Sequence, residues 1–300
     1  MQSSSSRSSF LLVLLPGLML GSTLVFTRFS LGQFAPLMQV ALRLSLASLA
    51  FLVAYGVFRV RSWPSDRSLW IRSGVYGLIG TAVTMTAYTN SLRYQSSGVT
   101  SLLVTLSPIV TAIMAHLFLK DGSLNRRRWL GALISFAGAG LLLIRGESGL
   151  AELSRADWRG YAWAILGVIS NSAGLVYARR YLNAADPFVV TSIRILVGAL
   201  VIIGVAFFTV GFDFSHARAS GFLALLYAAI VGTFFAFLFY LTAVQRLGAT
   251  VASQTEYVVP MAATLLGVLL LGERVTPTMG IGMVVISIGL WVFDRGRKTS

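Results

Sequence analysis

The chain has 300 residues, of which 56% are hydrophobic and 11% are charged, and its mean hydropathy is +0.79. These values exclude an ordinary soluble domain and indicate an integral membrane protein. The net charge of +14 is spread over the ends of apolar stretches rather than gathered in one patch, which argues against a nucleic-acid partner. The absence of cysteine excludes disulfides, thiolate metal sites and a cysteine nucleophile.

Apolar stretches long enough to cross about 30 Å of hydrocarbon recur along the chain with short gaps between them. They must be helical, because an open strand in lipid would leave its backbone groups unpaired. We therefore predict an all-α membrane protein with ten transmembrane helices, at residues 10–28, 36–58, 69–92, 97–119, 128–145, 159–179, 187–210, 219–243, 249–271 and 278–293.

The polar leader MQSSSSRSSF has no small-residue cleavage site after it, so we expect it to be retained as the start of the first helix. With the N-terminus inside, 15 basic residues fall on the cytoplasmic side of the membrane and seven on the opposite side. The positive-inside rule then predicts that both termini are cytoplasmic.

The chain also resembles itself when it is displaced by 151 or 152 positions. The matched residues include Arg28, Pro36 and Arg43 with Arg179, Pro187 and Arg194, and Gly80, Thr81, Tyr88, Ser101 and Pro108 with Gly232, Thr233, Tyr240, Ser253 and Pro260. The match predicts two five-helix repeats, residues 1–147 and 148–300. Because five is odd, the second copy enters the membrane from the opposite side and the repeats are inverted.

Inverted repeats usually enclose a binding site near the midplane and expose it to each side in turn, which favours a transporter. The alternative is a duplicated scaffold without a pathway. Polar side chains inside hydrocarbon point to the pathway, because they are costly unless they face the bundle interior or water. On two matched helices they share one face: Ser97, Ser101, Thr105 and Pro108, and Ser253, Glu256, Tyr257 and Pro260. Pro108 and Pro260 are expected to kink their helices.

Glu256 is the only carboxylate inside a predicted helix, and its repeat partner is Val104. Three explanations stay open: a proton or cation site, a contact to a substrate amino group, or an ion pair. Arg194 lies at a similar predicted depth, about 10 Å from the same surface, so the two could pair. Arg43, the other intramembrane arginine, either snorkels or offers its charge to an anion.

These features, with Pro260 followed by Leu271-Gly272-Glu273-Arg274, resemble the drug/metabolite transporter superfamily and its EamA-type domains. The first half departs from that motif, with Leu119-Lys120-Asp121-Gly122 after Pro108. Within the superfamily the chain resembles bacterial YddG-type amino-acid exporters.

The resemblance implies export of amino acids, aromatic and other neutral ones, across the bacterial inner membrane through a central cavity lined by both halves. Such a cavity needs groups for an ammonium and a carboxylate, and an apolar or aromatic wall. The candidate lining residues are Tyr88, Ser101, Thr105, Trp163, Asn171, Tyr240, Gln245, Ser253, Glu256 and Tyr257. No metal or cofactor is expected, and the partners are the lipid bilayer and a small-molecule substrate.

Other classes of protein fit less well. An intramembrane enzyme would need a motif such as H-E-x-x-H or G-x-S-x-G, or a second facing acid, and the sequence has none of these. A channel-like facilitator and an exporter of another small metabolite or drug remain as alternatives. The cargo, the transport direction, the coupling ion and the oligomeric state cannot be read from the sequence.

Overall fold

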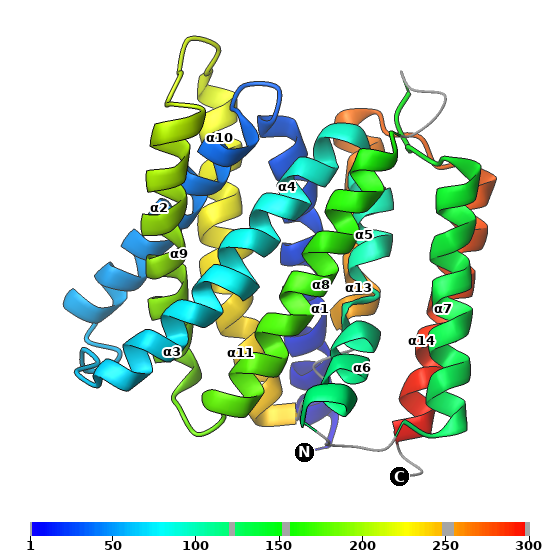
Figure 1. The fold of residues 1–300 in the computed structure, drawn as a ribbon, viewed down its shortest axis with the longest axis horizontal. Helices are drawn as coiled ribbons and strands as arrows, with labels where there is room; N and C mark the ends of the chain where they lie inside the picture. Colours follow the sequence, from blue (N-terminus) through cyan, green and yellow to red (C-terminus); the bar gives the residue numbers. More distant parts are fainter. Residues whose placement is uncertain (1, 120–123, 152–156, 248–254, 298–300) are drawn as a thin grey trace.

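The computed structural model describes residues 2–119, 124–151, 157–247 and 255–297, and in these ranges every regular element is helical (Figure 1). The first half contains α1 (Gln2–Ser30), α2 (Pro36–Gly56), α3 (Arg67–Gly77), η1 (Leu78–Val83), α4 (Thr84–Tyr94), α5 (Ser97–Val104), α6 (Ser107–Leu119) and α7 (Arg126–Arg145). The second contains α8 (Trp158–Tyr181), α9 (Pro187–Thr209), α10 (Ala219–Ala229), η2 (Ile230–Phe235), α11 (Ala236–Leu247), α13 (Thr255–Leu271) and α14 (Pro277–Arg297).

The predicted stretches coincide with helices wherever the chain is described, although three of them are subdivided. Eight helices in the described ranges are long and apolar enough to cross a membrane, and α13 is shorter, with 17 residues. The continuous run from α3 to α4 is not among the eight, and α4 contains polar residues on several turns. The structure therefore supports an all-helical membrane fold, while the count of ten crossings stays a prediction.

Two π-helical segments, η1 and η2, interrupt helical runs at positions 152 residues apart. Each contains the sequence Gly-Thr, at Gly80-Thr81 and at Gly232-Thr233. A π-helical turn is rare and is frequent at functional sites, because it changes the direction of side chains and widens the helix locally. The displacement of 152 positions found in the sequence thus relates the two π-helical segments as well as the two Gly-Thr pairs.

Close packing between helices depends on small residues, as is usual where helices meet inside a membrane. Gly17 and Gly21 form a G-x-x-x-G pair on α1 that rests on α13, so that a Cβ at Gly17 would meet the side chain of Val258. α7 and α14 pack against each other at the edge of the bundle, and Ser135 Oγ donates to the Ile286 carbonyl at 3.2 Å (Figure 1). This placement agrees with their apolar, glycine-rich composition.

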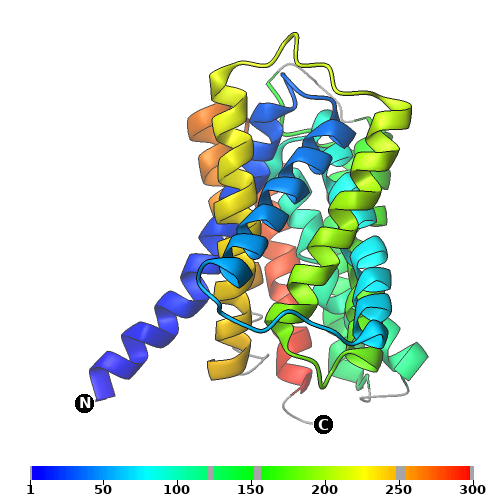
Figure 2. The same cartoon turned by 90° about the vertical axis from the view of Figure 1, so that its left-hand side faces the viewer.

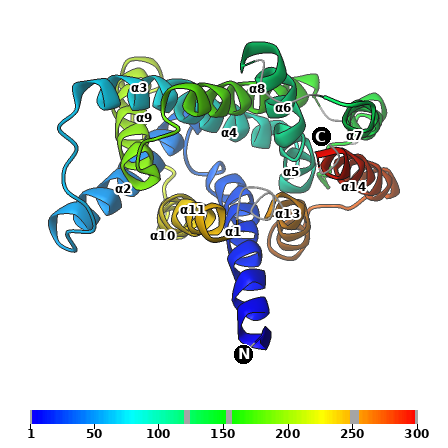
Figure 3. The ribbon, with the colours of Figure 1, turned by 90° about the horizontal axis from the view of Figure 1, so that it is seen from below.

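The views from the side and from below show how the helices surround the interior. α1 slants out of the bundle at its N-terminal end (Figure 2). Seen from below, α3, α4 and α8 form one row, and α11, α1 and α13 form a second row opposite it (Figure 3). The start of α1 and the end of α14 lie at the same end of the bundle (Figure 1).

Candidate functional site

A cavity of about 530 Å³ lies between these rows and is lined by residues of both halves of the chain. It extends from residues of α1 and α4 to the connection between α8 and α9, where Asn183 is exposed. This volume is in the range of small-molecule sites, which are usually concave and mostly apolar with a few polar groups. The cavity therefore reaches the surface at the end of the bundle where α8 ends.

The cavity contains three predicted intramembrane charges, Arg43, Arg194 and Glu256. Arg43 is carried by α2 and Arg194 by α9, which lie together at one side of the bundle, whereas Glu256 is carried by α13, beyond α1 (Figure 3). Among the described ion pairs, none involves any of the three. An unpaired charge away from water is costly, so these groups point to a ligand or to water within the cavity.

Arg43 is 9% exposed and is held by hydroxyl groups rather than by an acid. Its Nε donates to Thr233 Oγ1 at 3.0 Å, and a terminal nitrogen donates to Thr27 Oγ1 at 3.3 Å. The side chain thus does not snorkel to the surface. Arg43 lines the cavity, and an anion as the partner of its charge stays a prediction.

Arg194 is 6% exposed and lies between two aromatic rings. Its guanidinium carbon is 4.7 Å from the centre of the Tyr76 ring and 4.5 Å from that of Phe237, and a terminal nitrogen donates to the Tyr76 hydroxyl at 2.6 Å. Arg194 and Glu256 therefore line one cavity without forming the ion pair that was one of the possibilities at the sequence level.

The remaining lining combines aliphatic side chains with hydroxyl-bearing and aromatic ones. Of the predicted uncharged residues, Tyr88, Asn171 and Tyr240 line the cavity. The sequence did not single out several further residues that do so: Thr27, Tyr76, Thr89, Ser107 and Phe237. The last of these could have been found only through its contact with Arg194, since a phenylalanine in an apolar helix carries no signal of its own.

Four predicted residues lie away from the cavity. Ser101 and Thr105 are buried and donate to carbonyls of their own helix, at Gly98 and Leu102. Trp163 is half-buried outside the cavity lining, and the Tyr257 hydroxyl donates to Asp294 of α14 at 3.1 Å. Two more calls, Ser253 and the side chain of Gln245, lie outside the described part of the chain.

The two predicted kinks have different settings. Pro108 is the second residue of α6. Helix α5 ends at Val104, so a break between the two helices precedes Pro108. Pro260 lies inside α13, three residues after Tyr257. Both therefore lie on the helices that line or support the cavity, but only the first stands at a change of helix.

At the other end of the cavity the structure forms a buried ion pair between Arg28 and Glu273. Arg28 Nε lies 3.2 Å from Glu273 Oε1, and a terminal nitrogen of Arg28 donates to the carbonyls of Leu92 and Gln95. Glu273 also accepts hydrogen bonds from the amide and hydroxyl of Ser97, at 2.9 and 2.7 Å. These contacts join α1, α4, α5 and the connection after α13, and they close this end.

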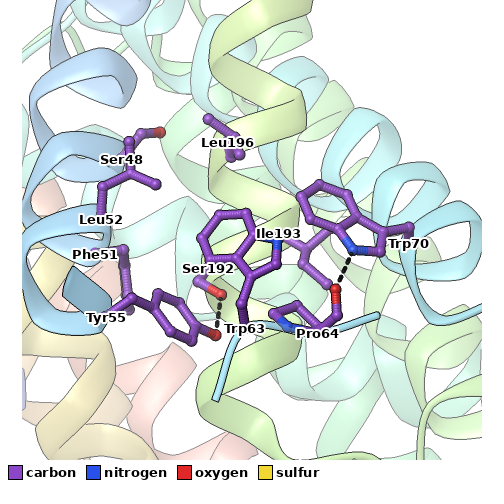
Figure 4. A pocket seen from close by; sticks show the side chains of 10 residues that line it. All are labelled: Ser48, Phe51, Leu52, Tyr55, Trp63, Pro64, Trp70, Ser192, Ile193 and Leu196. Carbon is purple, nitrogen blue, oxygen red and sulfur yellow. Dashed lines mark hydrogen bonds between the residues drawn. The ribbon is translucent and has the colours of Figure 1, made fainter. Parts of the chain in front are cut away.

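A second, small pocket lies between α2, α9 and the α2–α3 connection (Figure 4). Its volume is about 10 Å³, which is at the lower limit for a single water molecule. The Tyr55 and Ser192 hydroxyls are hydrogen-bonded across it at 2.9 Å, and Trp70 Nε1 donates to the Pro64 carbonyl at 3.0 Å (Figure 4). The pocket is therefore a packing feature of this region and is too small for a substrate.

Comparison with known proteins gives a consistent family match. The sequence profile of the EamA-like transporter family matches the chain twice, over residues 7–144 and 158–293. The uncharacterized inner membrane transporter YedA of Escherichia coli is 29% identical over 276 residues, which are 90% of this chain and 86% of YedA. The uncharacterized transporter YyaM of Bacillus subtilis is 23% identical over 90% of this chain and 88% of its own length.

Two further similarities extend the comparison to a plant protein and to a solved structure. A chloroplastic WAT1-related protein of Arabidopsis thaliana is 24% identical over 91% of this chain, which spans 66% of that protein's length. A crystal structure matches with a TM-score of 0.67 over 98% of both chains, at 21% identity. At that identity the structural likeness speaks for the fold alone.

Proposed function

This chain belongs to the EamA-like transporter family and is a membrane transporter, and we propose that it exports amino acids across the bacterial cytoplasmic membrane. The substrates are aromatic and other neutral amino acids, as the resemblance to amino-acid exporters implies. Both chain termini are cytoplasmic in this proposal, in accordance with the distribution of basic residues.

The observation that carries the proposal is the chemistry of the cavity, where Arg43, Arg194 and Glu256 lack ion-pair partners among the described residues. A zwitterionic amino acid supplies both missing charges: its ammonium group pairs with Glu256 and its carboxylate with an arginine. The rings of Tyr88 and Tyr240 offer an amphipathic wall for its side chain. Such a ligand removes two unpaired charges at once.

Alternating access is the mechanism that we propose for this transport. The cavity reaches the surface near Asn183, and the opposite end is closed around Arg28 and Glu273. The two matches of the family profile, and the two π-helical segments 152 residues apart, support two related halves that exchange conformations. A substrate bound at Glu256 would then face each side of the membrane in turn.

A second candidate is the export of another small metabolite that is anionic. The cavity lining has two unpaired arginines and one unpaired carboxylate among the described residues, so a ligand with more negative than positive charge also fits. The aromatic rings at Arg194 do not distinguish between the two candidates. Counterflow of labelled amino acids does.

The experiment that tests the proposal is counterflow of labelled phenylalanine, threonine and methionine in proteoliposomes. We expect saturable exchange by the native protein and its loss in Glu256→Gln, because the amide cannot pair with an ammonium group. Tyr257→Phe is the matched control, since Tyr257 follows Glu256 on α13 but contacts Asp294 instead of the cavity. Both variants should be folded by size-exclusion chromatography.

The alternatives have distinct outcomes in the same assay. Equilibration without counterflow would indicate a channel-like facilitator, because only a carrier exchanges one substrate molecule for another. Native exchange that survives Glu256→Gln would remove Glu256 from the substrate site while leaving the carrier. No exchange of any of the three amino acids would overturn the amino-acid assignment.

A further inference from the structure

Two arginines and two threonines occupy matched positions in the two halves of the chain. Arg43 and Arg194 are 151 positions apart, and Thr81 and Thr233 are 152 positions apart. Thr81 lies in η1 and Thr233 in η2. Helix α2, which carries Arg43, packs against η2, and helix α9, which carries Arg194, packs against η1. Each arginine is therefore carried by a helix that packs against the π-helical segment of the other half.

Of the two possible arginine–threonine pairs, Arg43–Thr233 and Arg194–Thr81, the first is formed. Arg43 Nε donates to Thr233 Oγ1 at 3.0 Å, and the Thr233 hydroxyl donates in turn to the Ala228 carbonyl at 2.9 Å. Thr233 is fully buried and Arg43 is 9% exposed. This chain of hydrogen bonds fixes the position of the Arg43 guanidinium in the cavity.

The matched pair is not formed, although the helix that carries Arg194 packs against the segment that carries Thr81. Arg194 Nε and Thr81 Oγ1 are both buried and have no hydrogen-bond partner. Gly198 lies one helical turn after Arg194, and a Cβ at Gly198 would be 3.7 Å from Thr81 Cγ2. The Arg194 guanidinium is instead held by the ring and hydroxyl of Tyr76.

A buried donor and a buried acceptor without partners are unusual, and each destabilises the conformation that contains it. Because both atoms are shielded from the cavity, a bound substrate cannot satisfy them without a rearrangement. A movement that brings Arg194 Nε to Thr81 would satisfy both at once. The present conformation thus satisfies one of two matched pairs and leaves the other open.

We propose that the Arg43–Thr233 and Arg194–Thr81 pairs are alternating latches, of which this conformation closes the first and the oppositely open conformation closes the second. The proposal rests on the alternating-access part of the proposed function and adds the residues that stabilise each state. One hydrogen bond from a guanidinium to a threonine is exchanged for another. The two states therefore stay close in free energy, as a carrier that visits both requires.

In this mechanism Thr81 and Thr233 are positioning residues, because they act through the arginines. Thr233 holds Arg43 in the present state and leaves Arg194 on the Tyr76 and Phe237 rings. In the opposite state Thr81 holds Arg194, and Arg43 is released. Each state consequently holds a different arginine by its threonine, Arg43 in the present state and Arg194 in the opposite one.

The test measures the populations of the two states in the absence of substrate. The chain has no cysteine, so two spin labels can be attached at Leu11→Cys on α1 and Ala184→Cys in the α8–α9 connection, both of which are exposed. Distances between the labels, measured by double electron–electron resonance, report the opening between α1 and α8. The two sites lie outside the cavity lining.

We expect Thr233→Val and Thr81→Val to shift the populations in opposite directions. Thr233→Val removes a bond of the present state and lowers its population relative to the other by about tenfold, and Thr81→Val raises it by about tenfold. The two valine variants then differ from each other by about a hundredfold, so both states need not be visible in the native protein. Arg194→Lys, which lacks Nε, should act like Thr81→Val.

Matched controls separate the hydroxyl group from general packing. Thr84→Val should leave the populations unchanged, because the Thr84 hydroxyl donates only to the Ile79 carbonyl of its own helical run. Thr81→Ser and Thr233→Ser retain the hydroxyl and should behave like the native protein. In the double variant with Thr81→Val and Arg194→Lys the shifts should not add, because both changes remove the same bond.

The proposal is overturned if the two valine variants shift the populations in the same direction, or if neither shifts them. It is also overturned if the serine variants behave like the valine variants. Since no substrate is present, failure of the amino-acid assignment in counterflow leaves this result intact. Conversely, normal counterflow with unshifted populations removes the latches and leaves the transporter.

Discussion

The Arg28–Glu273 and Arg61–Asp186 ion pairs lie at opposite ends of the bundle and are built in the same way, but they differ in burial. In each pair the carboxylate also accepts hydrogen bonds from backbone amides in the first turn of a helix, α5 for Glu273 and α9 for Asp186. The side chains are 21% and 4% exposed in the first pair and 53% and 37% exposed in the second.

The difference in burial assigns different roles to the two pairs. Water screens the exposed pair, so it contributes little to stability and can separate freely. The buried pair cannot lose one member without leaving an uncompensated charge. The closed end of the cavity is therefore the end with a strong, cooperative contact. The end at α8 and α9 is open, and its ion pair, between Asp186 and Arg61 of the α2–α3 connection, is exposed and screened.

The largest expected effect comes from removing the buried carboxylate. Glu273→Ala leaves Arg28 without its ion-pair partner and the Ser97 amide without its acceptor, and it should reduce the free energy of unfolding by about 3–5 kcal/mol. Chemical denaturation in detergent measures this quantity. Hydrogen exchange of the amides in the first turn of α5 should accelerate in the same variant.

A carboxylate at the same end, which forms no ion pair with a described residue, is the control for that change. Glu147 accepts a hydrogen bond from the Thr276 hydroxyl at 2.8 Å, and Glu147→Ala should cost only about 1 kcal/mol. Equal losses in the two variants would mean that the Arg28–Glu273 pair stabilises the fold no more than the Glu147 hydrogen bond does. The contrast between the two ends would then fail.

A smaller effect is expected from a glycine that makes room for the buried pair. A Cβ at Gly267 would overlap Glu273 Oε2 and lie 2.7 Å from Ser97 Oγ, so Gly267→Ala must displace the carboxylate. We expect a loss of about 1–3 kcal/mol, as for other overpacked sites. Gly280→Ala on α14 meets no atom within 4 Å and should be neutral or slightly stabilising. The thermal unfolding midpoints of the two alanine variants measure this difference. Equal midpoints would contradict the prediction.

Hydropathy and charge along the sequence predicted the helical stretches and the presence of Glu256, Arg43 and Arg194 inside them. They could do so because an ionisable residue in a long apolar segment is informative without knowledge of its neighbours. Glu273 lies just beyond the helix predicted at 249–271, so hydropathy gives it no role, and its partner Arg28 is remote in the sequence. The Leu271-Gly272-Glu273-Arg274 motif was the signal that could have identified it.

The hydroxyl stripe of the helix predicted at 97–119 was less informative. Ser101 and Thr105 lie on one face as expected, but each satisfies its hydroxyl with a carbonyl three residues earlier and lies away from the cavity. A serine or threonine can always bond in this way, so spacing alone does not show whether it faces a pathway. The π-helical segments were likewise beyond prediction, because Gly-Thr in an apolar run has no distinctive pattern.

The smallest expected effect concerns the exposed pair and depends on pH. Partial burial acts to raise the pKa of Asp186, but the hydrogen bonds from Arg61 and from the Phe188 and Val189 amides outweigh it and hold the pKa below its usual value. A carboxyl with a lowered folded-state pKa stabilises the fold above its unfolded pKa of about 4, and this contribution is lost as the pH falls through the lower folded value.

Arg61→Ala should therefore cause a small loss of stability at neutral pH that disappears in acid, where Asp186 is protonated in both proteins. The loss should also shrink in high salt, because both side chains are screened. Arg67→Ala removes an arginine of the same region that forms no ion pair with a described carboxylate, and it should give the native pH profile. A loss in Arg61→Ala that persists below the Asp186 pKa would show that the arginine acts through packing. The exposed pair would then resemble the buried one more than its accessibility indicates.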